Sequence, residues 1–264
     1  MTTVRRLQIE SEIPRHWFGG NPLQTHLANA LTFVFPAGER FFVRSVHHYN
    51  QNINDSHLRL KVRIFAGQEI QHQLSHQQAF LALEQQGYEI QSYLAWYENM
   101  AYTIIEPASP PELRLATTAA LEHFTSALGE FALATEMLDL VHPAMQALLK
   151  WHAAEEIEHR DVAFEVLKQV APGWGWRFAG FLVALATLAI FWTAGITHLT
   201  KQEKKLFLRE GALEVYGFLR RYGPMFSLRL LSYLKPGFHP MQSQCDELAE
   251  AYFASVAAQA SKSH

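Results

Sequence analysis

The stretch GQEIQH at residues 67–72 places Glu69 three residues before His72. A second stretch, EEIEH at residues 155–159, repeats this spacing between Glu156 and His159. Three residues advance an α-helix by roughly 300°, so the two side chains of each pair lie about 60° apart on one face. Each pair can therefore bind one ion or two adjacent ions.

Two further glutamates complete a repeating pattern. Glu39 lies in FPAGE at residues 35–39, and Glu122 ends the apolar run AALE at residues 119–122. The order Glu, Glu-x-x-His, Glu, Glu-x-x-His, with one element on each of four helices, is the ligand pattern of ferritin-like di-iron carboxylate bundles. The spacing suits two antiparallel hairpins joined by a longer crossover. The sequence therefore predicts an all-α, ferritin-like four-helix bundle with a dinuclear metal site held by Glu39, Glu69, His72, Glu122, Glu156 and His159.

Three other side chains are alternatives near this site. His76 lies one helical turn after His72, and His152 lies one turn before Glu156, so each is either an additional ligand or a partner of the ligands. Glu155 is four residues before His159 and could replace Glu156. No catalytic residue beyond these groups is assigned.

Hydrophobic periodicity predicts helices throughout and no sheet. The bundle, with its lead-in, is expected over residues 1–172, and a C-terminal helical region over residues 173–264. The expected helices cover residues 23–34, 36–49, 57–86, 92–105, 111–138, 144–170, 178–199, 202–221 and 241–260. The helix 202–221 is expected to break at Gly223-Pro224, and a basic, apolar stretch follows at residues 225–234.

The composition excludes several classes of protein. The net charge of the 264 residues is -3, and no basic cluster indicates nucleic-acid binding. The single cysteine, Cys245, cannot form an intramolecular disulfide or a cysteine-rich metal site. The first 20 residues have no apolar signal-peptide core, so we expect a cytoplasmic protein.

The segment 178–199 contains no Lys, Arg, Asp or Glu. As a helix it would span roughly 33 Å, close to the thickness of a bilayer core of about 30 Å. One interpretation is a helix attached to the inner face of the cytoplasmic membrane that delivers an apolar substrate, and the basic, aromatic stretch 201–235 favours it. The other is a helix buried against the bundle or in a homodimer interface.

Three stretches carry a family resemblance: FPAGERFF at 35–42, QEIQHQLSH at 68–76 and WHAAEEIEHRDVAF at 151–164. They resemble a bacterial family of predicted metal-dependent hydrolases. The resemblance implies a metal-dependent hydrolase. The glutamates and histidines of the family motifs correspond here to Glu39, Glu69, His72, His76, Glu122, Glu156 and His159.

The residue chemistry leaves three functions open. We favour a di-iron, O2-dependent oxidase or oxygenase acting on a small organic, lipid-like substrate with an unidentified electron donor. The alternative is a metal-dependent hydrolase that uses a metal-bound hydroxide. The second alternative is a non-catalytic iron-binding bundle. In each case the cofactors are two metal ions, with iron expected and manganese or zinc as alternatives.

Overall fold

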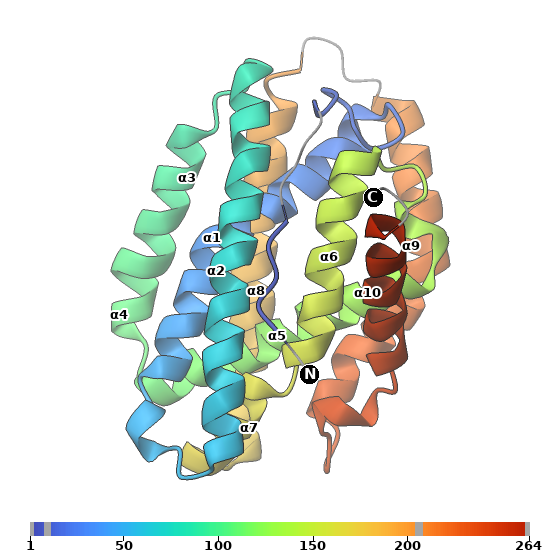
Figure 1. Ribbon diagram of the computed structural model, residues 1–264. Coiled ribbons are helices and arrows are strands. Elements are labelled where there is room, and N and C mark those ends of the chain that lie inside the picture. Colours follow the sequence, from blue (N-terminus) through green and yellow to red (C-terminus); the bar gives the residue numbers. More distant parts are fainter. Residues whose placement is uncertain (1–2, 8–11, 204–207, 262–264) are drawn as a thin grey trace.

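The computed structural model describes residues 3–7, 12–203 and 208–261 (Figure 1). Helices account for almost all regular structure in these ranges, and their only bridge between extended segments joins Phe18 and Val141. The prediction of an all-α fold is therefore confirmed. The ferritin-like bundle and the dinuclear site stay predictions.

Five helices carry the predicted ligands or extend the bundle. They are α1 (Pro22–His47), α2 (Ser56–Gln85), α5 (Pro111–Ala134), α6 (Pro143–His159) and α7 (Val162–Val170). The connection from α2 to α5 contains α3 (Gln91–Glu98), a π-helical segment η2 (Asn99–Ile105) and α4 (Glu106–Ala108). After α7 come α8 (Trp174–Thr200), α9 (Leu208–Leu231) and α10 (Asp246–Ala260).

The helix α1 corrects the predicted break before residue 36. Asn21 caps it by accepting from the backbone N–H of Leu23 at 2.9 Å, and the helix then continues through Pro36. An internal proline removes one backbone hydrogen bond and costs about 3 kcal/mol in a helix. Burial of Phe33 and Phe41 on the two sides of Pro36 offsets this cost. Glu39 therefore lies well inside a long helix and not near the start of one, as the predicted break would have placed it.

The helix α2 agrees with the prediction at both ends. Asp55 caps it by accepting from the backbone N–H of His57 at 2.9 Å. Gly87, just beyond its end, has a φ of +86°, a conformation that favours glycine. Glu69 and His72 lie in its middle, where fraying does not reach.

The predicted helix over residues 144–170 is divided into α6 and α7 directly after His159. The side chain of Arg160 is 1% exposed, and it pairs with Asp246 of α10 at 2.8 Å. Asp161, the next residue, pairs with Lys61 of α2 at 2.6 Å. These two ion pairs hold the chain at the break, a tertiary effect that helical periodicity does not report.

The C-terminal helices also differ from their predicted bounds. The helix α9 passes through Pro224, where a break was predicted. The start of the predicted helix 202–221 includes residues 204–207, which lie outside the described residues. The last helix begins at Asp246, after a short 3₁₀ turn at Pro240–Gln242, and not at residue 241.

The apolar helix α8 packs against α1 and α5. A Cβ atom at Gly180 would lie 2.4 Å from the backbone of Ala116, and one at Gly195 would lie 3.1 Å from Ala30. Among the described residues α8 alone is long and apolar enough to cross a membrane, and 28% of its most apolar window is buried. Core helices can pass the same test, so membrane attachment stays a prediction, as does the domain boundary at residue 172.

The N-terminal segment of residues 3–7 crosses the front of the bundle between α2 and α6 (Figure 1). Gln68 of α2 donates to the carbonyl of Thr3 at 3.4 Å, and Ser75 donates to that of Leu7 at 3.2 Å. Arg5 pairs with Glu158 of α6 at 2.7 Å. The segment therefore ties together the two helices that carry the Glu-x-x-His pairs.

Candidate metal centre

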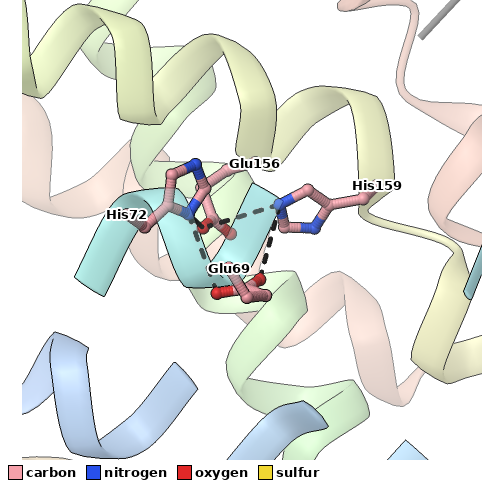
Figure 2. A group of neighbouring side chains, drawn as sticks. All are labelled: Glu69, His72, Glu156 and His159. Atoms are coloured by element: carbon pink, nitrogen blue, oxygen red, sulfur yellow. Dashed lines mark ion pairs between the residues drawn. The ribbon is translucent and has the colours of Figure 1, made fainter. Parts of the chain in front are cut away.

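The two Glu-x-x-His pairs face each other across the interface of α2 and α6 (Figure 2). One donor atom from each of Glu69, His72, Glu156 and His159 lies within 4.8 Å of the others. Nδ1 of His72 is 3.7 Å from both Glu69 Oε2 and Glu156 Oε1. Nε2 of His159 is 3.5 Å from Glu69 Oε1. The i, i+3 spacing thus brings both pairs to one point, as the sequence predicts.

A second group lies beside the first and contains Glu39, His76 and His152. Nε2 of His152 is 3.6 Å from Glu39 Oε1 and 2.7 Å from Glu156 Oε1, so Glu156 belongs to both groups. Nδ1 of His152 lies 2.7 Å from Nε2 of His76. Both alternative histidines are therefore at the centre.

Glu122 and Glu155 contact histidines from the outer side. Glu122 of α5 accepts at Oε2 from Nδ1 of His159 over 2.9 Å and has no partner at Oε1. Glu155 contacts Nε2 of His72 at 3.1 Å and Arg5 at 3.1 Å. Glu155 therefore lies behind His72 and does not take the place of Glu156.

Three histidines share one arrangement. His72, His152 and His159 each have one ring nitrogen bonded to a partner, namely Glu155, His76 and Glu122. The other nitrogen of each ring faces the carboxylates at the centre. Metal-ligating histidines characteristically bond their second nitrogen to such a partner, which fixes the tautomer and the ring orientation.

The donor atoms at the centre are buried, and several lack a hydrogen-bond partner. Both oxygens of Glu39 and of Glu69, Nδ1 of His72 and Nε2 of His159 are in this state. A buried polar atom without a partner costs about 1–3 kcal/mol, and a buried unpaired charge costs more. A divalent cation would satisfy these atoms and neutralise the gathered carboxylates, so the residues fit a metal site.

The carboxylates of the centre differ in their pKa values. Burial raises the pKa of Glu69 and of Glu122 to about 8. Glu156 differs, because the charge of His159 and a hydrogen bond from His152 outweigh burial and lower the pKa of Glu156 to about 2. The charges of Glu122 and Glu156 likewise outweigh burial and raise the pKa of His159 well above its ordinary value. Protons therefore compete with cations for these groups.

Two neighbours of the centre have no signal in the sequence. Thr125, one turn after Glu122, donates a short hydrogen bond to Glu156 Oε2. Arg5 reaches the centre through Glu155, from a segment that carries no periodic pattern. A threonine in an apolar helix and an arginine near a chain end are too common to indicate these contacts.

A third group of potential ligands lies apart from the centre and was not predicted. Glu203 lies far along the chain from His16 and His26, so no helical spacing relates the three residues. Nε2 of His16 and Nε2 of His26 lie 3.2 and 2.9 Å from the same oxygen, Glu203 Oε1. Tyr88 donates to that oxygen as well, and Arg15 lies 3.5 Å from it.

A family profile described as "Predicted metal-dependent hydrolase" matches residues 3–244. The chain belongs to this family. The match includes every residue of the candidate centre, so the family description and the buried His and Glu groups agree on metal dependence. Neither the curated proteins nor the solved structures contain a match to the chain.

Membership in the metal-dependent hydrolase family bears on the predicted functions. It supports the alternative of a metal-dependent hydrolase and gives no support to the favoured oxidase. The family and the buried His and Glu groups thus support metal dependence, whereas iron, the presence of two ions, and the assignment of ligands stay predictions.

Proposed function

We propose that this protein is a metal-dependent hydrolase of carboxylic esters whose two ions lie between α1, α2, α5 and α6. The main support is the arrangement of His72, His152 and His159, each with one nitrogen held by a partner and the other facing buried carboxylates. Membership in a family of predicted metal-dependent hydrolases supports the class of reaction.

The proposed ligands combine the predicted set with one alternative residue. They are His72 Nδ1, His152 Nε2, His159 Nε2, Glu39, Glu69 and Glu156, while Oε1 of Glu122 can add a further contact. When bound, two such ions would supply Lewis acidity that polarises an ester carbonyl, and they would lower the pKa of the water molecule that is consumed as the ester becomes an acid and an alcohol.

The remaining side chains orient the ligands. Glu155 and Glu122 hold the imidazoles of His72 and His159 from behind, and Thr125 donates to Glu156. His76 fixes the ring of His152. Burial lowers the pKa of both His76 and His152, so each ring is neutral near pH 7 and can use a nitrogen lone pair.

Aromatic rings exclude water from the centre on several sides. The ring centroid of Phe65 is 5.0 Å from that of His159, and that of Trp151 is 4.9 Å from that of His72. Phe35 packs at 4.8 Å against His152. Water exclusion strengthens the electrostatic interaction between the carboxylates and bound cations.

The test combines metal content with turnover. Protein purified without added metal is analysed by mass spectrometry for bound metals and is then assayed with p-nitrophenyl esters under nitrogen. We expect bound metal, loss of turnover with a chelator, and recovery when the metal is restored. Glu69→Ala should lose both metal and turnover, whereas Glu84→Ala on the same helix should keep both.

Two results would contradict the proposal. One is ester turnover that survives in metal-free Glu69→Ala protein. The other is an absence of turnover under nitrogen combined with oxygen consumption by the ferrous protein, which would favour the oxidase prediction.

A further inference from the structure

A cavity of about 770 Å³ lies between α1, η2, α5, α8 and α9. Its volume is within the range of roughly 300–1,000 Å³ that small-molecule sites occupy. Most of its lining residues are aliphatic or aromatic, and the polar ones include Glu106 and Arg114. The function proposed above uses none of this space.

The burial pattern of α1 and α5 independently marks the cavity. On α1, Leu27, Leu31 and Phe35 recur at four-residue intervals, line the cavity and are only half-buried. On α5, Leu121 and Leu128, seven residues apart, also line the cavity and are half-buried. Neighbouring apolar residues on the other faces of these helices are fully buried. Each helix thus presents an apolar stripe to open space in the interior.

Several polar groups in the lining are already bonded to protein. Glu106 pairs with Arg44 at 2.6 Å, and the hydroxyls of Tyr97 and Tyr102 lie 2.6 Å apart. Thr187 donates to a backbone carbonyl of its own helix at 2.7 Å. A strongly polar or charged ligand would find few free partners, because satisfying it would require breaking these bonds.

The cavity is long. On α5 its lining extends from Arg114 to Phe131, which corresponds to roughly 26 Å along a helix. On α9 it extends from Val215 to Leu230, a similar length. An extended aliphatic chain fits such a space better than a compact ring system does.

One part of the cavity wall belongs to the metal centre. Thr125 lines the cavity and donates to Glu156. Phe35 lines it too, and its ring packs against His76 at 5.0 Å. Gly38, next to Glu39, is a third shared position. The wall between cavity and metal centre is therefore a single layer of side chains at Thr125 and Phe35.

The cavity is also bordered by exposed apolar side chains. Leu185 of α8 and Leu219 of α9 both line it, and they are 46% and 56% exposed. Because these two residues are both lining and exposed, the space between α8 and α9 connects the cavity with the surface. At this opening an entering apolar chain would contact the side chains of two leucines.

We propose that this cavity binds the unbranched aliphatic chain of the substrate, with the scissile ester directed past Thr125 toward Glu156. The ester in this inference rests on the proposed hydrolase function, whereas the binding of the aliphatic chain does not. It names the substrate class as long-chain esters, whether they come from free solution or from a lipid surface.

Chain binding is measured first on the metal-free protein, so that it does not depend on turnover. Decan-1-ol, dodecan-1-ol and tetradecan-1-ol displace a fluorescent alkyl probe, and each added methylene should tighten binding about four-fold. Leu128→Trp on α5 and Ala28→Trp on α1 each fill part of the cavity and should weaken binding at least ten-fold. Leu81→Trp, on the exposed face of α2, is the control and should leave binding unchanged.

Turnover by the metal-loaded protein is the second measurement. The ratio kcat/KM should rise with acyl chain length for p-nitrophenyl esters, and Leu128→Trp should remove this rise while retaining hydrolysis of the acetate ester. Turnover of esters supplied in phosphatidylcholine vesicles is compared with turnover of the same esters dissolved below their aggregation limit. The comparison shows whether the substrate comes from a lipid surface or from free solution. Chain-length preference with either source agrees with the proposal.

The outcomes separate the two proposals. Chain binding that Leu128→Trp and Ala28→Trp abolish, without any hydrolysis, would keep the cavity assignment and overturn the hydrolase. Hydrolysis with no chain-length preference, together with chain binding unaffected by both variants, would overturn the cavity assignment and keep the hydrolase. Circular dichroism of each variant checks that the helices are retained.

Discussion

Two groups of histidines and glutamates in this molecule look alike in composition and differ in how their atoms are satisfied. In the candidate metal centre, Glu39 and Glu69 have no hydrogen-bond partner at any of their four carboxylate oxygens. In the group of His16, His26 and Glu203, Tyr88 and both histidines converge on one oxygen of the single carboxylate. The first group leaves these oxygens free for a cation, whereas in the second group protein donors already surround the carboxylate oxygen, and of the two buried ring nitrogens of His26 only Nδ1 lacks a partner.

The electrostatics of the two groups follows from this difference. Although burial opposes it, hydrogen bonds from Tyr88, His26 and His16 lower the pKa of Glu203 to about 2, so its charge is compensated by protein groups. Burial raises the pKa of Glu69 and Glu122 to about 8, so their charges are not compensated. The site expected to bind metal is distinguished by buried glutamates with raised pKa values. The number of histidines and glutamates does not distinguish it.

The largest contrast is expected when one histidine is removed from each group. His159→Ala should lower metal affinity by more than about 100-fold, because it removes a proposed ligand and not only a partner of one. His26→Ala should leave the metal content unchanged. Metal analysis after dialysis against a buffered metal concentration measures both, and equal loss in the two variants would remove the distinction.

A smaller effect is expected from a side chain that acts through a ligand. Glu155→Gln replaces the carboxylate that holds Nε2 of His72, and metal affinity should fall about 10–100-fold. Glu158→Gln alters a neighbouring carboxylate that pairs with Arg5 and contacts no ligand, so affinity should stay within about two-fold. Titration with a competing chelator gives both values. A drop in Glu158→Gln as large as that in Glu155→Gln would contradict the role of Glu155.

The free energy of unfolding should depend on pH differently in the metal-free and in the metal-bound protein. Without a cation, Glu69 and Glu122 hold protons in the folded protein up to about pH 8, while an unfolded chain has released them below pH 6.5. The raised pKa of His159 acts in the same direction. The folded state then binds more protons between pH 6.5 and 8, so its free energy of unfolding falls as pH rises, by on the order of 1 kcal/mol per pH unit.

Bound metal should reverse this trend, because cations require deprotonated ligands and bind better as pH rises. Thermal unfolding at several pH values, with and without a chelator, gives the two slopes. In the metal-free protein, the double variant Glu69→Gln/Glu122→Gln should flatten the decline. A metal-free protein that becomes more stable from pH 6.5 to 8 would contradict the raised pKa values.

The smallest effect is expected from the hydrogen-bonded group around Glu203. Glu203→Gln keeps the size of the side chain and removes the charge that accepts from His26, so we expect a loss of about 1–3 kcal/mol in the free energy of unfolding. Denaturant unfolding measures this loss. Metal content and ester turnover should be unchanged, and a fall in either would show that the two groups are coupled.

The sequence predicts much of the centre because helical geometry alone aligns residues at i and i+3. Glu69 with His72, and Glu156 with His159, face a common point for this reason. The apolar run around Glu122 likewise predicts a buried carboxylate, since such a residue on an apolar face points inward. The structure brings all six predicted ligands to the centre, and metal binding by them stays a proposal.

Other features depend on contacts between distant segments, which no periodicity reports. Which nitrogen of His152 faces Glu156 depends on where His76 lies. The break after His159 depends on the pairing of Arg160 with Asp246. The group at Glu203 joins this residue to His16 and His26, which are separated from it by most of the sequence. Tertiary packing also overrides the helix-breaking tendency of Pro36.

Anomalous diffraction from crystals of protein purified without added metal tests the account most directly. Data at the absorption edges of iron, manganese and zinc identify the metal and its position. We predict two peaks in the buried space among Glu39, Glu69, His72 and Glu156, and none at Glu203. A fully metal-loaded protein with no peak at this centre, or with its peak between His16 and His26, would contradict the account.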